Sequence, residues 1–541
     1  MLTFGWKKAL GVVLTVGVLG QLSPISTASA ANSPFSDIEQ SYAKQQINDL
    51  YQRGIVSGKG AGLYDPIAPI TREEFVSMLG RTIGLQPLPS TVSSFTDVST
   101  SSWSYPWIQA GNSVGIVGGV SANQFAPAAQ ISREEAATLL VRAMESNYTA
   151  ASSSAATIHV PFADASDASG WAKPYVYDAD RFGLMHGDDD GEFRPREPIT
   201  REETAIVLAR ILSRVVPVSS VPSGEEQVQL GWQFGETDQS FLQKVEASGT
   251  INTLSPRWFF LQEDDSVAHA GADKSMVEWA HQRGKKVWPL VGNHFNQQLS
   301  HLYLSQPAQR QKLVSDLIGY AQQYGVDGLN IDFEGLIGSD RADFTAFIQE
   351  LSSAAHVQGL KISVDLPPNF HTEISAAYDY AVLAQSADYL VLMGYDEHWN
   401  GSPRAGSVSS LPWLKKGIDS FLAAMPATKV IVGLPLYTRD WYSASSGKTL
   451  SQELTLPQQT TRLANASYIW DASVGQYVAT YQQKGLTHTV WVEDARSLAL
   501  KYSIALDRGV AGVAYWRIGG ETVDVWTSLQ NVWRYKKVSS L

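Results

Sequence analysis

The chain contains no cysteine among its 541 residues. Disulfide bonds and thiolate metal sites are therefore excluded. The ten histidines are scattered, and none forms the HExxH pair with which a zinc hydrolase binds its metal. Any hydrolytic chemistry must come from carboxylates or hydroxyl groups, and we expect neither a metal nor a cofactor.

Long apolar segments are also nearly absent. The one clear run, residues 9–19, follows two lysines and precedes the Ala-Ser-Ala of residues 28–30. This order predicts a secretory signal over residues 1–30, with cleavage after Ala30. The alternative, a retained membrane anchor, is disfavoured because the run is shorter than the roughly 20 residues that a spanning helix needs. We expect an exported protein with no membrane attachment after the signal is removed.

Positive charge is in short supply, since 41 lysines and arginines face 53 aspartates and glutamates, for a net charge of −12. An acidic protein is a poor candidate for nucleic-acid binding. The apolar fraction of 44% and the charged fraction of 17% are those of folded globular proteins. The length predicts several folded units.

One pattern occurs three times between residues 31 and 216. Each copy opens with Phe-x-Asp, passes through a glycine-rich turn and reaches Arg-Glu-Glu after a Thr or Ser. That Thr or Ser is a helix N-cap, and the acid three positions later completes a capping box, so an apolar helix is predicted next. We expect repeats at residues 31–90, 91–150 and 158–216, a Ser/Ala-rich spacer at 147–158 and a linker at 217–226. The three motifs are Ile70-Thr71-Arg72-Glu73-Glu74, Ile131-Ser132-Arg133-Glu134-Glu135 and Ile199-Thr200-Arg201-Glu202-Glu203.

These motifs resemble those of S-layer homology repeats, which attach exported bacterial proteins to a secondary cell-wall polysaccharide. The resemblance implies that Arg72, Arg133 and Arg201 bind this polymer, often a pyruvylated one. An arginine exposed beside a helix N-terminus suits a carboxylate-bearing sugar. The alternative is that the three arginines only pair with neighbouring acids. Four aromatic side chains could either stack on sugars or belong to the core: Trp103, Trp107, Trp171 and Tyr175.

Residues 227–541 alternate short apolar runs with helical patterns. Eight such runs over about 315 residues predict an α/β fold, a (β/α)8 TIM barrel. The stretch 438–487 is too long for one loop, so we expect a small α+β lobe inserted after the seventh strand, where it could wall one side of a groove. The predicted strands are Gln227–Gly231, Thr253–Phe260, Lys286–Val291, Gly328–Phe333, Lys361–Leu366, Tyr389–Met393, Val430–Leu436 and Val510–Tyr515.

The fourth run, within residues 327–334, alternates apolar and polar side chains with the period of a β-strand. Asn330, Asp332 and Glu334 therefore share one face, which ends at the C-terminal tip of the strand. Two acids this close cannot both ionise freely, so one holds its proton at a raised pKa, as a general acid requires. The alternative is an amphipathic strand with a solvated acidic face, and the alternation alone does not separate the two. The opposite face carries Leu329, Ile331 and Phe333.

This stretch resembles the DxxDxDxE signature of glycoside hydrolase family 18, with Asp327, Asp332 and Glu334 on three of the four acidic positions. Asn330 departs from the strict pattern. The Asn form, together with residues 393–399, resembles the branch of the family that contains spore-cortex and cell-wall N-acetylglucosaminidases. The similarity extends over nearly all of residues 227–541 through further segments: Gly433-Leu434-Pro435-Leu436-Tyr437, His488-Thr489-Val490-Trp491-Val492-Glu493-Asp494-Ala495-Arg496-Ser497 and Gly512-Val513-Ala514-Tyr515-Trp516.

The resemblance implies substrate-assisted catalysis, in which the 2-acetamido carbonyl of the sugar is the nucleophile and an oxazolinium ion forms. Glu334 would protonate the glycosidic oxygen. Asp332 would stabilise the developing positive charge, and Tyr395 would hold the acetamido oxygen. Asn330 lacks a carboxylate that could store a proton behind Asp332. Asp327 has the wrong parity for the acidic row and is interpreted as structural.

Three further residues follow from the resemblance as substrate-binding: Trp516, Asp396 and Met393. Trp516 would floor the pocket under the sugar ring, although a core tryptophan closing the barrel is the alternative. Tyr395, Asp396 and Trp516 are predicted to lie at C-terminal strand ends, where barrel enzymes have their active sites.

The sequence therefore predicts a glycosidase on the surface of a Gram-positive-type bacterium, anchored to the wall by its repeats. The substrate would be peptidoglycan or a chitin-like polysaccharide. Peptidoglycan is favoured because an anchor holds the enzyme beside its producer's own wall. The alternatives are a chitinase acting on external chitin, a non-catalytic carbohydrate-binding barrel, which would lack the terminal Glu, and a structural surface-layer subunit.

Overall fold

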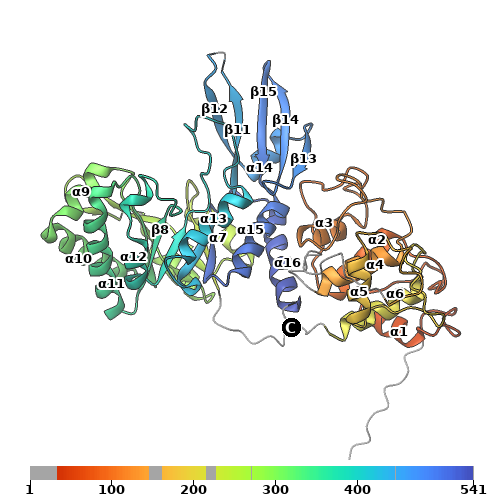
Figure 1. The fold of residues 1–541 in the computed structure, drawn as a ribbon. Coiled ribbons are helices and arrows are strands. Elements are labelled where there is room, and N and C mark those ends of the chain that lie inside the picture. The colour runs from red at the N-terminus through yellow and green to blue at the C-terminus, as the bar shows by residue number, and fades with distance from the viewer. Residues whose placement is uncertain (1–32, 145–160, 215–226, 270, 445, 540–541) are drawn as a thin grey trace, which may run out of the picture.

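The computed structural model describes residues 33–144, 161–214, 227–269, 271–444 and 446–539. The predicted signal, the spacer and the linker lie outside these residues. Figure 1 shows a helical N-terminal part beside a larger part built of strands and helices. Within the described ranges, no helix is long and apolar enough to cross a membrane.

The N-terminal part contains two helices in each of three repeats, and the second of each pair begins at the motif arginine, as the sequence predicts. The capping boxes also form: the Thr71 hydroxyl accepts from the Glu74 N–H while Glu74 accepts from the Thr71 N–H, and Thr200 and Glu203 do the same. The helices are α1 (Lys44–Gln52), α2 (Arg72–Thr82), α3 (Tyr105–Ser113), α4 (Arg133–Met144), α5 (Lys173–Arg181) and α6 (Arg201–Leu212).

A closed ring of backbone hydrogen bonds joins the three repeats. The N–H of Ile70 donates to the carbonyl of Ile199, that of Ile199 to Ile131, and that of Ile131 to Ile70, each at 3.1 Å. All three isoleucine side chains are fully buried in one shared core. Each repeat therefore contacts both others, and the repeats form one unit with approximate threefold symmetry.

Eight parallel strands form a closed barrel in the larger part, which confirms the predicted (β/α)8 fold. The second strand is interrupted at Pro256 and the third at Pro289. The first half of the second strand pairs with the first half of the third, and the second halves pair likewise, so the sheet closes. The barrel strands are β1 (Val228–Trp232), β2 with β3 (Thr253–Ser255 and Arg257–Leu261), β5 with β6 (Lys286–Val287 and Leu290–Gly292), β7 (Gly328–Asp332), β8 (Lys361–Leu366), β9 (Tyr389–Leu392), β10 (Val430–Pro435) and β16 (Gly512–Trp516).

Helices cover the outside of the barrel, and their apolar faces share one core with the outward-facing strand residues. A short strand, β4 (Val267–Ala268), extends β3 as a hairpin. The helices are α7 (Asp238–Ser248), α8 (Lys274–His281), α9 (Gln297–Ser305), α10 (Pro307–Tyr324), α11 (Arg341–Val357), α12 (Tyr380–Ser386), α13 (Leu411–Leu422), α15 (Ala495–Asp507) and α16 (Val523–Ser539), with 3-10 turns η3 (Gly338–Asp340), η4 (Ser375–Ala377) and η5 (Ala427–Lys429).

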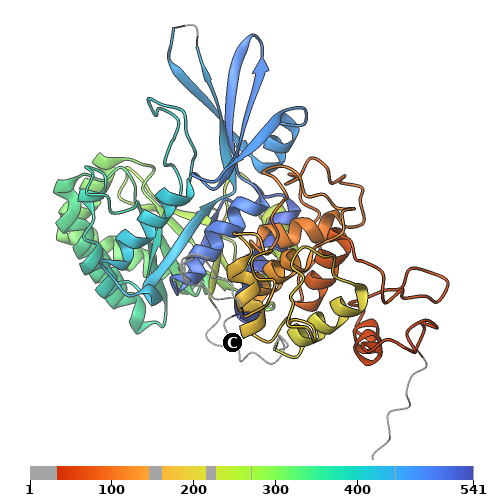
Figure 2. The same ribbon diagram turned by 45° about the vertical axis from the view of Figure 1, so that its right-hand side comes forward.

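A lobe interrupts the barrel between β10 and α15, as predicted. Its five strands form an antiparallel sheet in the order β12-β11-β15-β14-β13, and it projects away from the barrel in both views (Figures 1 and 2). Because β11 begins two residues after β10 ends, the lobe stands at the C-terminal end of the barrel strands. Its elements are β11 (Tyr437–Ser443), β12 (Thr449–Thr455), α14 (Leu456–Arg462), β13 (Ser467–Asp471), β14 (Gln476–Gln483) and β15 (Leu486–Val492).

The repeats pack against the last helix of the barrel. The side chain of Asn531 in α16 accepts from the N–H of Gln86 at 2.7 Å and donates to its carbonyl at 2.8 Å. Tyr535, also in α16, donates its hydroxyl proton to the carbonyl of Arg142 and lies within the core of the repeats. The helical part and the barrel therefore share a specific interface (Figure 2).

Candidate functional site

Strand β7 places its polar residues where the alternation predicts. Leu329, Ile331 and Phe333 are fully buried in the layer between strands and helices, where Phe333 stacks on Phe347 with ring centres 5.5 Å apart. The alternate residues face the barrel interior. Asp332 is the last residue of the strand, so Glu334 lies just beyond its C-terminal end.

Asn330 lies at the centre of a fully satisfied hydrogen-bond network inside the barrel. Its Oδ1 accepts from the Trp232 indole at 2.8 Å and from the Ser255 hydroxyl at 3.1 Å. Its Nδ2 donates to Ser363 Oγ at 3.0 Å and to Asp365 Oδ1 at 2.7 Å. An indole N–H only donates, so it fixes the orientation of the Asn330 amide.

The backbone of Glu334 is held by Asn293, which follows β6 and is almost fully buried. The N–H of Glu334 donates to Asn293 Oδ1 at 3.1 Å, and Asn293 Nδ2 donates to the Glu334 carbonyl at 2.7 Å. The Tyr378 hydroxyl donates to the carbonyl of Phe333 at 2.9 Å. Contacts from two neighbouring loops thus fix the backbone that carries the Glu334 side chain.

The electrostatics of the site favour a protonated Glu334. Burial, followed by the charges of Asp332 and Asp396, raises the pKa of Glu334 well above its usual value, against a lowering effect of Arg257. Burial raises the pKa of Asp332 to about 6, and Arg257 again opposes the rise. Asp332 therefore loses its proton more readily than Glu334, which leaves one base beside one acid near neutral pH.

Arg257 is a site residue that the sequence analysis missed. It begins β3, and its guanidinium lies 4.8 Å from the centre of the Phe234 ring and 4.9 Å from that of Phe260. Its Nε is buried and has no hydrogen-bond partner among the described residues. It supplies the positive charge that faces the two acids, and only the closed barrel brings this strand to them.

Tyr395 and Trp516 come together at the barrel mouth. Their rings are stacked, with centres 6.4 Å apart and planes inclined by 23°, and both meet Trp232 edge-on. A Cβ atom at Gly433 would lie 3.1 Å from the Tyr395 ring, so glycine makes room for this tyrosine. Trp516 stays partly exposed at the end of β16, where its ring is available to a sugar.

Asp396 and Met393 follow β9 in the same region. Asp396 accepts a hydrogen bond of 2.5 Å from the Tyr437 hydroxyl, and its backbone is left-handed, with φ of 61°. Met393 is partly buried, and its N–H donates to the carbonyl of Leu366 at 2.9 Å. Both residues thus lie at the strand ends that carry Tyr395 and Glu334.

Two other segments of the family resemblance have structural roles. Asp327 precedes β7 at the opposite end of the barrel, where it pairs with Lys286 at 3.0 Å and His281 at 2.8 Å. In residues 488–497, Glu493 forms a fully buried ion pair with Lys501, and Asp494 caps α15. These acids stabilise the barrel and the lobe, and they are not part of the acidic row that ends at Glu334.

The three motif arginines are not exposed, contrary to expectation. Arg72, Arg133 and Arg201 are only 6%, 5% and 1% accessible, because the neighbouring repeat packs over each helix N-terminus. Each Nε donates to a backbone carbonyl of another repeat, at 2.7 to 2.9 Å. The ion pairs also run from repeat to repeat: Arg72–Glu135 at 2.6 Å, Arg133–Glu203 at 2.7 Å and Arg201–Glu74 at 3.6 Å.

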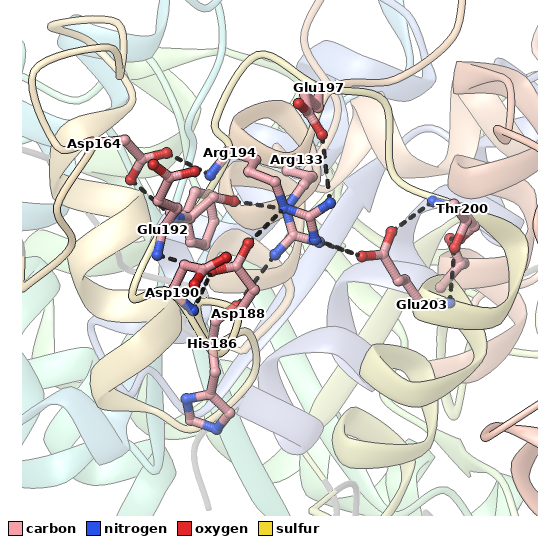
Figure 3. A network of polar contacts seen from close by, with 12 residues as sticks. Arg133, Asp164, His186, Asp188, Asp190, Glu192, Arg194, Glu197, Thr200 and Glu203 are labelled. Atoms are coloured by element: carbon pink, nitrogen blue, oxygen red, sulfur yellow. Dashed lines mark hydrogen bonds and ion pairs between the residues drawn. The ribbon is translucent and has the colours of Figure 1, made fainter.

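The edges of two of these arginines nevertheless line cavities. In Figure 3, Arg133 and Arg194 converge between Asp188 and Glu203, beside His186. This cavity has a volume of about 170 Å³, and Tyr42 and Arg210 also line it.

The equivalent cavity at Arg201 has a volume of about 210 Å³ and is lined by Arg81 and Trp103. The cavity at Arg133 thus combines three arginines with Tyr42, and the cavity at Arg201 combines two arginines with Trp103. Trp103 and Trp171 are 56% and 53% accessible, so they are surface residues, whereas Tyr175 is buried. Trp107 lies under the guanidinium of Arg81.

Comparison with known proteins gives two family matches. The model for glycosyl hydrolases family 18 matches residues 251–521. The model for the S-layer homology domain matches residues 34–76, 94–137 and 161–205.

Individual proteins are similar to part of the chain. The uncharacterized glycosylase YvbX of Bacillus subtilis is 25% identical over 341 residues, which are 60% of this chain and 98% of YvbX. A cortical fragment-lytic enzyme of Bacillus subtilis is 28% identical over 250 residues, 45% of this chain and 58% of that enzyme, so the chain spans a little over half of that relative. Among solved structures, a chitinase from Chromobacterium violaceum is 26% identical with a TM-score of 0.52, covering 57% of this chain and 99% of that chain.

Proposed function

Because the chain belongs to glycosyl hydrolases family 18 and carries three S-layer homology repeats, we propose that it hydrolyses β-1,4-linked N-acetylglucosamine in peptidoglycan by substrate-assisted, retaining catalysis. The observation that carries this proposal is the pairing of Glu334, whose pKa is raised well above its usual value, with the more acidic Asp332. An acid that holds its proton at neutral pH is what the departure of an alcohol leaving group requires.

In the proposed mechanism Glu334 donates its proton to the glycosidic oxygen as the bond to C1 breaks. The acetamido carbonyl of the same sugar attacks C1 and closes an oxazolinium ring. The ionised Glu334 then removes a proton from water, which opens the ring from the side that the leaving group left. Two inversions at C1 retain the β-anomer.

Asp332 and Tyr395 are assigned to the acetamido group. The carboxylate of Asp332 accepts a hydrogen bond from the acetamido N–H and balances the positive charge of the oxazolinium ion. The hydroxyl of Tyr395 donates to the acetamido oxygen and aims it at C1. Trp516 lies under the sugar ring, while Asp396 and Met393 line the remainder of the same pocket.

Peptidoglycan is proposed as the substrate because of the anchor. S-layer homology repeats attach a protein to the cell surface, which keeps the catalytic domain at high effective concentration beside the wall. A relative named cortical fragment-lytic enzyme supports the same choice. The second candidate is a chitinase, which the similarity to a solved chitinase favours.

The repeats are proposed to bind a carboxylate-bearing wall polysaccharide in the cavities between them. At least two guanidinium groups and an aromatic ring line each of the two cavities described above, at Arg133 and at Arg201. A guanidinium pairs with a carboxylate in a bidentate manner, and an aromatic ring packs on a sugar face. Arg72 occupies the equivalent position in the remaining repeat.

The catalytic assignment is tested by replacing Glu334 with Gln, which keeps the shape of the side chain but removes its acid. Hydrolysis of an aryl-N-acetylglucosaminide should fall by roughly a thousandfold or more, because a general acid and its pocket act as a unit. Circular dichroism should be unchanged. Activity within a few-fold of the wild type would refute the role given to Glu334.

A further inference from the structure

We propose that Asp365, on strand β8, is a positioning residue that takes the place of the acid missing at position 330 and holds a proton behind Asp332. This inference rests on the proposed roles of Asp332 and Glu334. The sequence pattern of β7 alone offers Asn330 there, and an amide has no proton to share with a carboxylate.

The register of the barrel brings Asp365 to this position. Asn330 of β7 lies opposite Ser363 of β8, and the next pair is Ile331 with Val364. Continuing the same register sets Asp365 beside Asp332 on the interior face of the sheet, because alternate residues share a face. The hydrogen bond of 2.7 Å from Asn330 Nδ2 to Asp365 Oδ1 confirms that the carboxyl points inward.

Asp365 lies where an ionised carboxylate is costly. It is only 3% accessible, and among the described residues no lysine, arginine or histidine forms an ion pair with it. A buried carboxyl without a cationic partner keeps its proton. Because Asp365 Oδ1 accepts from Asn330, the proton is placed on Oδ2.

The charged groups around Asp365 agree with this protonation state. Burial, followed by the charge of Asp332, raises the pKa of Asp365 well above its usual value, and the charge of Glu334 adds to the rise. The other groups near these acids are the Asp396 carboxyl and the neutral Tyr395 hydroxyl beyond β9, and the Arg257 guanidinium on β3. Among Asp332, Glu334 and Asp365, the negative charge near neutral pH therefore lies on Asp332, between two protonated acids.

Such a cluster suits the proposed mechanism. Asp332 must stay ionised to stabilise the oxazolinium ion while Glu334 stays protonated to start the reaction. A neutral acid beside Asp332 stabilises its single charge without adding a second one. The carboxyl that the family pattern places on β7 is thus supplied by the neighbouring strand, two residues beyond the partner of Asn330.

A purely structural role makes a different prediction. If Asp365 only accepts the Asn330 hydrogen bond, then Asp365→Asn, which retains an acceptor oxygen, should leave the reaction unchanged. If it holds the proton, kcat should fall by roughly tenfold or more while KM changes by less than about threefold. The acidic limb of the pH profile should also move to higher pH, because Asp332 loses the neutral acid that stabilises its charge, so that its pKa rises.

The decisive variant moves the carboxyl back. Asn330→Asp combined with Asp365→Asn keeps one acid facing one amide, and it should recover most of the lost kcat and return the acidic limb toward its original position. A double variant no more active than Asp365→Asn would overturn the proposal, as would an unchanged pH profile in the single variant.

Controls separate this inference from the proposed function. Asp388→Asn removes an aspartate at the other end of the barrel, where it pairs with Lys361 at 2.8 Å, and should leave the pH profile unchanged. If Glu334→Gln retains activity, the proposed active site itself is wrong. If Glu334→Gln is inactive and Asp365→Asn is normal, only the inference fails.

The double variant also tests the proposal if Asp365→Asn alone does not fold. The double variant is then compared directly with the wild type and with Glu334→Gln. Activity within about tenfold of the wild type supports the proposal, and activity as low as that of Glu334→Gln contradicts it.

Discussion

Replacing Arg201 with Met is expected to destabilise the three-repeat unit by about 3 kcal/mol. The guanidinium donates to the carbonyl of Tyr64 at 2.8 Å and to that of Ser57 at 2.7 Å. Each buried acceptor left without a donor costs about 1–3 kcal/mol. The guanidinium also lies 4.5 Å from the centre of the Tyr64 ring, a contact that contributes about 1–2 kcal/mol. Relief from burying a charge offsets part of the sum.

Hydrogen–deuterium exchange of the full chain measures this loss within the repeats separately from the barrel. A change of about 3 kcal/mol corresponds to roughly a hundredfold faster exchange of amides that open with the repeats. The matched control is Arg196→Met, because Arg196 is exposed and its replacement should cost less than about 0.5 kcal/mol. Hydrogen–deuterium exchange within about threefold of the wild type in Arg201→Met would refute the role of Arg201 in holding the three repeats together.

Two further predictions concern the active site and the anchor. Arg257→Met removes the positive charge that lowers the pKa values of Asp332 and Glu334, so both pKa values should rise. Both limbs of the pH–kcat profile should therefore move to higher pH. A shift of either limb toward lower pH would contradict this prediction. Arg81→Ala with Arg210→Ala should weaken co-sedimentation with purified wall material by roughly tenfold without the destabilisation expected at Arg201, and unchanged sedimentation would mean that these cavities do not bind the wall.

Arg81 and Arg210 suit this test better than the motif arginines, because the motif arginines are buried between the repeats. Removing Arg72, Arg133 and Arg201 together would break the ring of repeats, so lost wall binding would then report unfolding rather than lost contacts. Arg81 and Arg210 lie in the last turns of their helices and touch the same cavities from the side.

Much of the barrel was predictable because its strands are locally encoded. The eight apolar runs and the period-two alternation of residues 327–334 follow from side chains that are neighbours in sequence. The insertion was predictable from length alone, since residues 438–487 exceed what one loop holds. Capping boxes such as that of Thr71 are likewise local.

Features that depend on distant segments were not predictable in this way. The sequence identified the helix N-terminus at Arg201 but not the repeat that covers it, and the expected exposure was therefore wrong. Asp365 and Arg257 belong to other strands than Asp332, and only the closure and register of the barrel bring them to it. The alternation within Lys361–Leu366, which puts Asp365 on one face with Ser363, was the one local signal available.

We propose above that the chain cleaves peptidoglycan with retention at N-acetylglucosamine. The most direct test of this proposal is to digest purified peptidoglycan and chitin oligosaccharides in parallel with the full chain, using Glu334→Gln as the inactive control. Mass spectrometry identifies the new reducing ends, and proton NMR during the first turnovers identifies their anomer. New N-acetylglucosamine ends from peptidoglycan, released as the β-anomer, are the predicted result; rapid cleavage of chitin with untouched peptidoglycan, or release of the α-anomer, would contradict it.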